Sequence, residues 1–318
     1  MAHKPSSAHS NNVGVPIYTI DVFTNRLFCG KSAAVLLIKQ EMPETQMQQI
    51  ACELNLPATC FVLAEQEDDT HEKSWHFTVR WFTPREEHEL STHAVLAAAH
   101  VLFEELKNPN RSIEFCTKSG PIVCQRTGIK WRYRAHFPTV DILETIPTNR
   151  FYGWCNERHK VKEAAPYFVH HLARLAAGPL NAVEVLYAPS IFRFESYRID
   201  HGHLLAIPQL GGDFIRAITV TMKGTPDNGC VDRNGQQYDY VSRWFSPWTE
   251  IDEAKAEGTA QLALAAYWTR VLDATDLYAK QCHPSGSGGT YRVSLRNDGR
   301  VDLVSDVLTV TKGSLMVS

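Results

Sequence analysis

Two short segments of this 318-residue chain combine chemically capable side chains with the start of an alanine-rich helix. The first runs from Ser91 through Thr92 to His93, and the second from Glu257 to Thr259. Small residues at a helix start let a ligand approach backbone N–H groups, which are unpaired in the first turn of any helix. Ordinary helix capping favours the same residue types. Because the pattern occurs twice, we interpret it as a paired site for an anion or a polarised carbonyl.

Two of these side chains could move protons. His93 lies in a first helical turn, and the ordinary pKa of histidine suits proton transfer near neutral pH; a hydrogen-bonded structural histidine is the alternative. Glu257 directly precedes a helix, where the helix dipole stabilises a carboxylate, so it could also be only an N-cap. We predict that His93 and Glu257 are catalytic. The predicted substrate-binding residues at the helix starts are Ser91, Thr92, Gly258 and Thr259.

The two helices belong to a longer internal repeat. Residues Arg80 to Pro84 read Arg-Trp-Phe-Thr-Pro, and residues Arg243 to Pro247 read Arg-Trp-Phe-Ser-Pro. Each copy follows a β-rich stretch and precedes an acidic loop and then a helix. The expected helices are Thr92–His100 and Gly258 to about Leu272. The repeat therefore predicts two halves of similar structure.

The remaining pattern indicates an α+β protein with two lobes, as its length also suggests. We expect a mobile tail at 1–12, a first lobe at 13–137 and a second at 138–318, whose last strand could pair back with the first lobe. The expected first-half elements are strands Val15–Phe23, Ser32–Ile38, Cys60–Ala64, Trp75–Phe82, Ser112–Cys116 and Ile122–Arg126, with a helix at Glu44–Leu54. The expected second-half strands are Val183–Tyr187, Leu204–Ile207, Ala217–Met222, Tyr238–Phe245, Thr290–Leu295, Arg300–Val304 and Val307–Thr311.

Composition excludes several classes of partner. A net charge of −3 supplies no large positive field, so we expect no nucleic-acid partner. The start of the chain lacks the apolar core of a signal peptide, and the most apolar stretch, Ala94 to Leu106, is too short to cross a membrane. We therefore expect a cytoplasmic protein without a membrane partner. Eight scattered cysteines without a CxxC pair predict reduced thiols and no metal site.

Several segments, in this order along the chain, resemble the PhzF-like (phenazine-biosynthesis-like) family of the diaminopimelate-epimerase-type fold. They are Asp21 to Thr24 with Gly30, Glu53 to Leu56, the two Arg-Trp-Phe segments, Gly288-Gly289 and Asp298 to Val301. The resemblance covers about residues 15 to 318. It implies two pseudo-symmetric lobes, each a β-rich sheet or barrel around a central helix, with no cofactor. We also expect a homodimer.

The resemblance also shows where this chain departs from the family. The family's Asn-Leu-Ser-Glu-Thr supplies a proton-moving glutamate, but the matching position here is Ala58. The aspartate of the family's Glu-Asp-Pro-x-Thr-Gly-Ser-Ala falls on Ala254. General acid–base catalysis contributes about 10²- to 10⁴-fold, so losing both carboxylates should abolish most of the usual reaction. We assign Ala58 and Ala254 to the substrate-binding wall.

The helix starts carry the remaining candidates. The family's Gly-His becomes Thr92-His93, which keeps only the histidine. In the related epimerases and racemases a cysteine precedes each of the two helices, and Ser91 and Glu257 occupy those positions here. By contrast, we expect Lys31, in a turn, to be solvated.

Two functions are consistent with these residues. The first is a cofactor-independent isomerase or cyclase that performs a double-bond shift or a pericyclic-type closure on a small unsaturated or carbonyl-bearing metabolite, as in specialised metabolism. Such reactions depend on orientation and carbonyl polarisation more than on two strong acids. The second is a catalytically silent ligand-binding or protein-interaction module, which the loss of both carboxylates favours.

Overall fold

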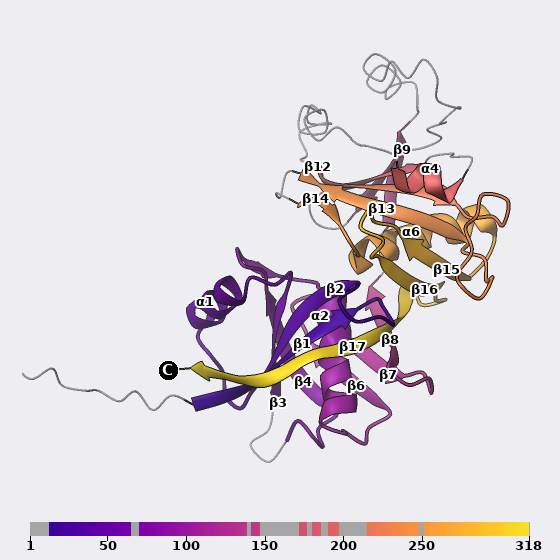
Figure 1. Cartoon of the computed structure of the whole chain (residues 1–318). Helices are drawn as coiled ribbons and strands as arrows, with labels where there is room; N and C mark the ends of the chain where they lie inside the picture. Colours follow the sequence, from indigo (N-terminus) through magenta and orange to yellow (C-terminus); the bar gives the residue numbers. More distant parts are fainter. Residues whose placement is uncertain are drawn as a thin grey trace, which may run out of the picture.

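The computed structural model describes residues 13–64, 70–138, 141–146, 172–176, 180–185, 190–196, 215–247 and 251–317. Two lobes are joined by one long strand, β17 (Arg300–Val317), drawn in yellow in Figure 1. The expected tail at 1–12 and the expected strand Leu204–Ile207 lie outside the described residues. Within this part of the chain, no helix is long and apolar enough to span a membrane.

The first lobe is a closed barrel. Its elements are β1 (Val13–Val22), β2 (Lys31–Ile38), α1 (Glu44–Leu54), β3 (Thr59–Ala64), β4 (His76–Phe82), β5 (Glu87–His88), α2 (Thr92–His100), the π-helical turn η1 (Val101–Glu105), β6 (Ser112–Cys116), β7 (Ile122–Arg126) and β8 (Arg132–Pro138). Strands β1, β2, β3, β4, β6, β7, β8 and β17 pair in this order, and β17 pairs again with β1. Closure leaves the ring without a free edge.

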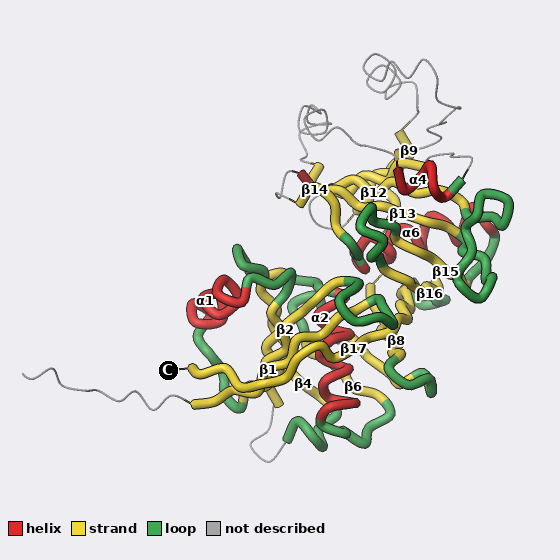
Figure 2. Tube along the Cα trace, viewed as in Figure 1, coloured by secondary structure: helices red, strands yellow, loops and turns green. Residues whose placement is uncertain are grey.

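Helix α2 fills this barrel. Every one of its residues is buried, and four of its nine residues are alanine. A helix that is apolar on all sides must be enclosed, and small side chains let it fit inside a ring of strands. It packs against β1, β2, β3, β7, β8 and β17 (Figure 2). The barrel therefore fixes the direction in which the start of α2 points.

The second lobe repeats the arrangement around another helix. Its elements are β9 (Asp141–Ile146), β10 (Leu172–Ala176), β11 (Leu180–Val185), α4 (Ile191–Ser196), β12 (Ile215–Lys223), β13 (Tyr240–Ser246), β14 (Ile251–Ala254), α6 (Gly258–Leu272), β15 (Asp276–Gln281) and β16 (Gly289–Leu295). The sheet runs in the order β9, β10, β11, β12, β13, β15, β16 and β17, and α6 packs against β9, β15, β16 and β17. The predicted α+β architecture of two pseudo-symmetric lobes is confirmed.

The repeated Arg-Trp-Phe segments occupy equivalent places. Arg80 on β4 donates two hydrogen bonds to Glu87 on β5 and lies 5.2 Å from the centre of the Phe82 ring. Arg243 on β13 donates the same pair of bonds to Glu253 on β14 and lies 5.0 Å from the ring two positions further along its strand. Strand, acidic hairpin and helix thus follow one another twice, as the sequence predicted.

The last strand differs from the prediction. Two strands were expected at 300–304 and 307–311, but β17 is continuous over 18 residues. The polar residues that break its apolar pattern are satisfied: Ser305 Oγ donates to Thr290 O at 2.7 Å, and Asp306 accepts two bonds from Arg132. Because these partners come from neighbouring strands, the polar interruption does not end the strand.

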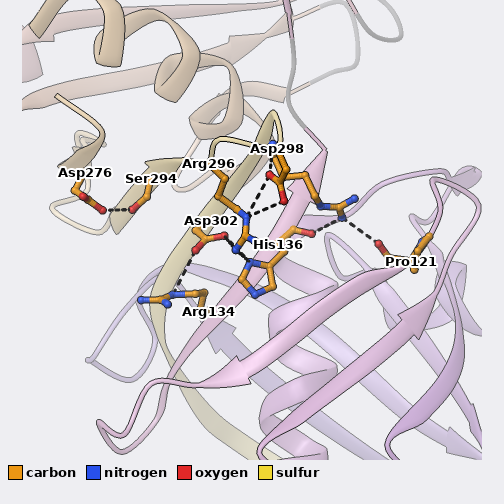
Figure 3. Close-up of polar contacts among 9 residues, drawn as sticks. Pro121, Arg134, His136, Asp276, Ser294, Arg296, Asp298 and Asp302 are labelled. Atoms are coloured by element: carbon orange, nitrogen blue, oxygen red, sulfur yellow. Dashed lines mark hydrogen bonds and ion pairs between the residues drawn. The ribbon is translucent and has the colours of Figure 1, made fainter. Parts of the chain in front are cut away.

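A polar cluster lies where β8 and β17 meet between the lobes (Figure 3). His136 Nδ1 is 2.5 Å from Asp302 Oδ1, and Arg296 Nη1 lies 3.4 Å from the same carboxylate. Burial alone would raise the pKa of Asp302, but the hydrogen bond from His136 and the charges of Arg296 and Arg134 outweigh it and hold the pKa below its ordinary value. The cluster stabilises the pairing of β8 with β17, the strand that connects the two lobes.

Candidate active site

The start of α2 presents polar atoms without partners. Four buried side-chain atoms in the described chain have no hydrogen-bond partner: Thr59 Oγ1, Trp81 Nε1, Thr92 Oγ1 and His93 Nε2. Two of them stand on adjacent residues in the first turn of α2. An unpartnered buried polar group costs about 1–3 kcal/mol, so such a pair points to a ligand that supplies the missing bonds.

Ser91 leaves this helix start without a side-chain cap. It is the N-cap residue of α2, but its side chain makes no capping bond. Its Oγ instead lies 3.3 Å from His93 Nδ1. That contact orients the imidazole and leaves the opposite nitrogen, Nε2, available. The helix dipole adds a partial positive charge at the same place.

The start of α6 is capped by a side chain. Glu257 is its N-cap residue, and Glu257 Oε1 accepts a hydrogen bond from the Thr259 N–H at 3.3 Å. Its other oxygen, Oε2, forms an ion pair with Lys31 from the first lobe. The two side chains are only 12% and 16% exposed, so this pair is largely shielded from water. Glu257 therefore caps α6, and its catalytic role stays a prediction.

The two helix starts touch each other. A Cβ atom added to Gly258 would lie 2.3 Å from Thr92 Oγ1 and 2.6 Å from Phe23 Cζ. Only glycine therefore fits here without a shift of its neighbours. The contact brings together the two segments that the sequence singled out, and with them His93 and Glu257. The catalytic and binding roles of these residues remain predictions.

The pKa of His93 differs from the expectation. Burial lowers it well below the ordinary value, and the positive charge of Lys31 and the neighbouring His88 lower it further. The expected titration near neutral pH is therefore wrong for the free site: His93 is a neutral imidazole there. A neutral ring can donate one hydrogen bond or accept one proton.

The methyl side chains of Ala58 and Ala254 cannot carry a proton. Ala58 is 3% exposed and belongs to the same apolar cluster as Phe23. Its carbonyl accepts a hydrogen bond from the Ala34 N–H at 2.9 Å. Ala254 ends β14, and its carbonyl accepts from Gln281 Nε2 at 2.9 Å. At both positions a hydrogen bond to the carbonyl fixes the backbone, and the side chain is only a methyl group.

Gln281 positions the second helix start and was missed by the sequence reasoning. Its Oε1 accepts the Glu257 N–H at 2.7 Å, while its Nε2 donates to Ala254. The Tyr291 hydroxyl and the Gln261 amide also reach Gln281 Oε1, each at 3.4 Å. The signal for it was weak, since a single glutamine in a strand rarely indicates a site.

Lys31 was also misjudged. It was expected to be solvated, but its side chain is only 16% exposed and pairs with Glu257. Asp21, which is 2% exposed, fixes the preceding turn because its carboxylate accepts bonds from Phe28 N–H and Ser32 Oγ, both at 2.7 Å. The buried aspartate in a β-rich run was a signal that this turn is held in place.

Comparisons with known proteins agree with this architecture. The model of the "phenazine biosynthesis-like protein" family matches residues 20–151 and 216–313. A human phenazine biosynthesis-like domain-containing protein is 31% identical over 95% of this chain and 99% of its own length. An uncharacterized isomerase of Halalkalibacterium halodurans is 29% identical over 95% of this chain and 98% of its length. The crystal structure of a PhzF-family protein from Enterococcus faecalis aligns with a TM-score of 0.73 at 26% identity, covering 96% of this chain and all of that one. The chain belongs to the phenazine biosynthesis-like family and has its diaminopimelate-epimerase-like fold.

Proposed function

We propose that this protein is a cofactor-independent isomerase or cyclase that acts on a small unsaturated or carbonyl-bearing metabolite. The substrate lies between the starts of α2 and α6. The observation that carries the proposal is the pair of unpartnered atoms, Thr92 Oγ1 and His93 Nε2, beside the Gly258 contact. A substrate oxygen supplies the hydrogen-bond partner that these two atoms lack.

The chemistry divides between the two helix starts. Thr92 and neutral His93 hold and polarise the substrate oxygen, and the dipole of α2 stabilises negative charge that develops there. Glu257 takes a proton from the carbon next to the polarised carbonyl and returns it one double bond further along. No atom is gained or lost, so the product is an isomer. A pericyclic closure uses the same binding without the proton transfer.

Names given to relatives support an isomerase. The related Halalkalibacterium halodurans protein and a related protein of Pseudomonas aeruginosa, 30% identical over 95% of this chain, are both described as uncharacterized isomerases. Neither name specifies a substrate. Because the resemblance aligns Ala58 and Ala254 with the family's acids, we do not transfer the family's usual substrate to this chain.

The experiment is a screen for isomerisation in D₂O with purified protein and a panel of unsaturated carbonyl compounds, read by NMR. For a substrate that turns over by proton transfer, Glu257→Gln should lower turnover by about 10²-fold or more. The matched control is Glu195→Gln. Glu195 also forms an ion pair with a lysine, Lys280, at 2.8 Å, but it belongs to neither helix start. A Glu257 that only caps α6 would leave turnover unchanged and lower stability by at most about 1 kcal/mol.

The second candidate function is a silent ligand-binding or protein-interaction module. The two methyl groups at Ala58 and Ala254 favour it, because the resemblance aligns these positions with the family's acids. In this case the panel compounds bind without conversion, and neither His93 nor Glu257 affects any rate. On the diene-acid type of substrate that the family's isomerases use, we expect no deuterium incorporation above background under either function.

A further inference from the structure

We propose that Lys31 binds an anionic oxygen of the substrate, carboxylate or enolate, and thereby releases Glu257 to act as a base. The inference rests on the proposed function for the place of the substrate between α2 and α6. It adds a residue that the repeat does not include, Lys31, and the charge of the substrate group that this residue binds.

The position of Lys31 is the first step of the argument. It is the first residue of β2 in the first lobe, and it reaches across to Glu257 at the start of α6 in the second. Its positive charge contributes to the lowered pKa of His93. Lys31 therefore lies close to both predicted catalytic groups, in a place from which most water is excluded.

The second step concerns Glu257. One of its oxygens accepts the Thr259 N–H, and the other is held by Lys31. Both oxygens are therefore engaged, and neither is free to accept a proton from a substrate carbon. For Glu257 to take a proton, Lys31 must find another acceptor. A substrate oxygen with a negative charge is such an acceptor.

The third step is the balance of charge. In the free site, Lys31 and Glu257 cancel, His93 is neutral, and Ala58 and Ala254 contribute nothing. The partial positive charges of two helix starts remain. A ligand with one negative charge therefore compensates the site.

The experiment measures affinity without turnover. Binding of three probes is followed by protein NMR: cyclohexanecarboxylate, the enolate of 1,3-cyclohexanedione, and neutral cyclohexanecarboxamide. Lys31→Met should weaken binding of the anionic probes by at least about tenfold, as expected for loss of a charge-assisted bond. Glu257→Gln should strengthen it by about threefold, because Lys31 loses its competing partner. The carboxamide should bind weakly to all variants.

The controls separate binding from folding. Lys280→Met breaks the comparable Lys280–Glu195 pair of the second lobe and should leave probe affinity unchanged. Lys31→Arg keeps the charge and should keep affinity within about threefold. If Lys31→Met does not fold, Glu257→Gln and Lys31→Arg decide the question.

Weaker binding of the anionic probes to Lys31→Met and stronger binding to Glu257→Gln support the inference. The anionic probe that binds more tightly shows whether Lys31 prefers a carboxylate or an enolate. Equal weakening in both variants, unchanged affinity in Glu257→Gln, or carboxamide binding as tight as carboxylate binding would overturn it. A failed isomerisation screen leaves these affinities as they are, so the two proposals fail separately.

Discussion

The two central helices begin in the same structural context but present different chemistry. Both follow an acidic hairpin, and both carry a hydroxyl or carboxyl residue at the N-cap. At α2 the Ser91 side chain contacts His93 and makes no capping bond. At α6 the Glu257 side chain caps the helix and binds Lys31. The two similar helix starts thus differ in that α2 has no side-chain cap, whereas α6 is capped by a carboxylate.

A second contrast lies within α2 itself. His93 and His100 are both buried and both have a lowered pKa, for which burial is the largest cause. His100 has a partner on each nitrogen, Tyr133 at 3.1 Å and Thr309 at 2.8 Å. His93 has a partner on only one. From this difference we predict a structural role for His100 and a ligand-binding role for His93.

The largest expected effect tests this contrast. His93→Gln should lower turnover of any substrate found in the screen by about 10²-fold, because the polarising group is lost. His100→Gln should change turnover less than about twofold yet lower the free energy of unfolding by about 2 kcal/mol, since two buried hydrogen bonds are disturbed. Steady-state kinetics and urea unfolding of both variants provide the comparison. A similar loss of turnover in His93→Gln and His100→Gln would contradict the different roles assigned to the two histidines.

The contact between the helix starts gives an effect of intermediate size. Gly258→Ala forces a methyl group against Thr92 and Phe23, so the free energy of unfolding should fall by about 1–3 kcal/mol. Gly313→Ala is the matched control, because a Cβ at that position meets nothing within 4 Å. Chemical denaturation measures both. Equal stability of the two variants would show that the helix starts do not touch.

The pH dependence gives the smallest effect. A histidine whose pKa is lowered on folding takes up a proton more readily when unfolded, so stability is complete above about pH 6.5 and falls as the pH drops below it. For His100 the fall continues to its folded pKa of about 4. Between pH 7 and 6 we expect a loss below about 1 kcal/mol per histidine. The slope should be shallower in His93→Gln and in His100→Gln, and an unchanged slope in either would contradict burial of that ring in neutral form.

Much of the architecture was predictable because it depends on local pattern. Helix α2 and helix α6 begin where the small residues predicted, since their apolar and alanine-rich runs leave no other register. The segments around His93 and Glu257 were recognisable for the same reason. Continuity of β17 was not, because its polar residues find partners on strands distant in sequence.

The electrostatics of the site could not be predicted locally. Lys31 and Glu257 stand 226 positions apart, and only the packing of two lobes brings them together. The pKa of His93 likewise depends on burial inside a closed barrel and on the charge of Lys31. A residue's type suggests what it could do, but its protonation state is set by neighbours that the pattern does not specify.

The most direct test of the central claim is a crystal structure of the protein with cyclohexanecarboxylate. We expect the ligand between the starts of α2 and α6, with a carboxylate oxygen within hydrogen-bond distance of Thr92 Oγ1 or His93 Nε2, the atoms that now lack partners. The His93 and Glu257 side chains should both face the bound molecule. Ligand bound elsewhere, or His93 and Glu257 side chains that point away from a common cavity, would contradict the account.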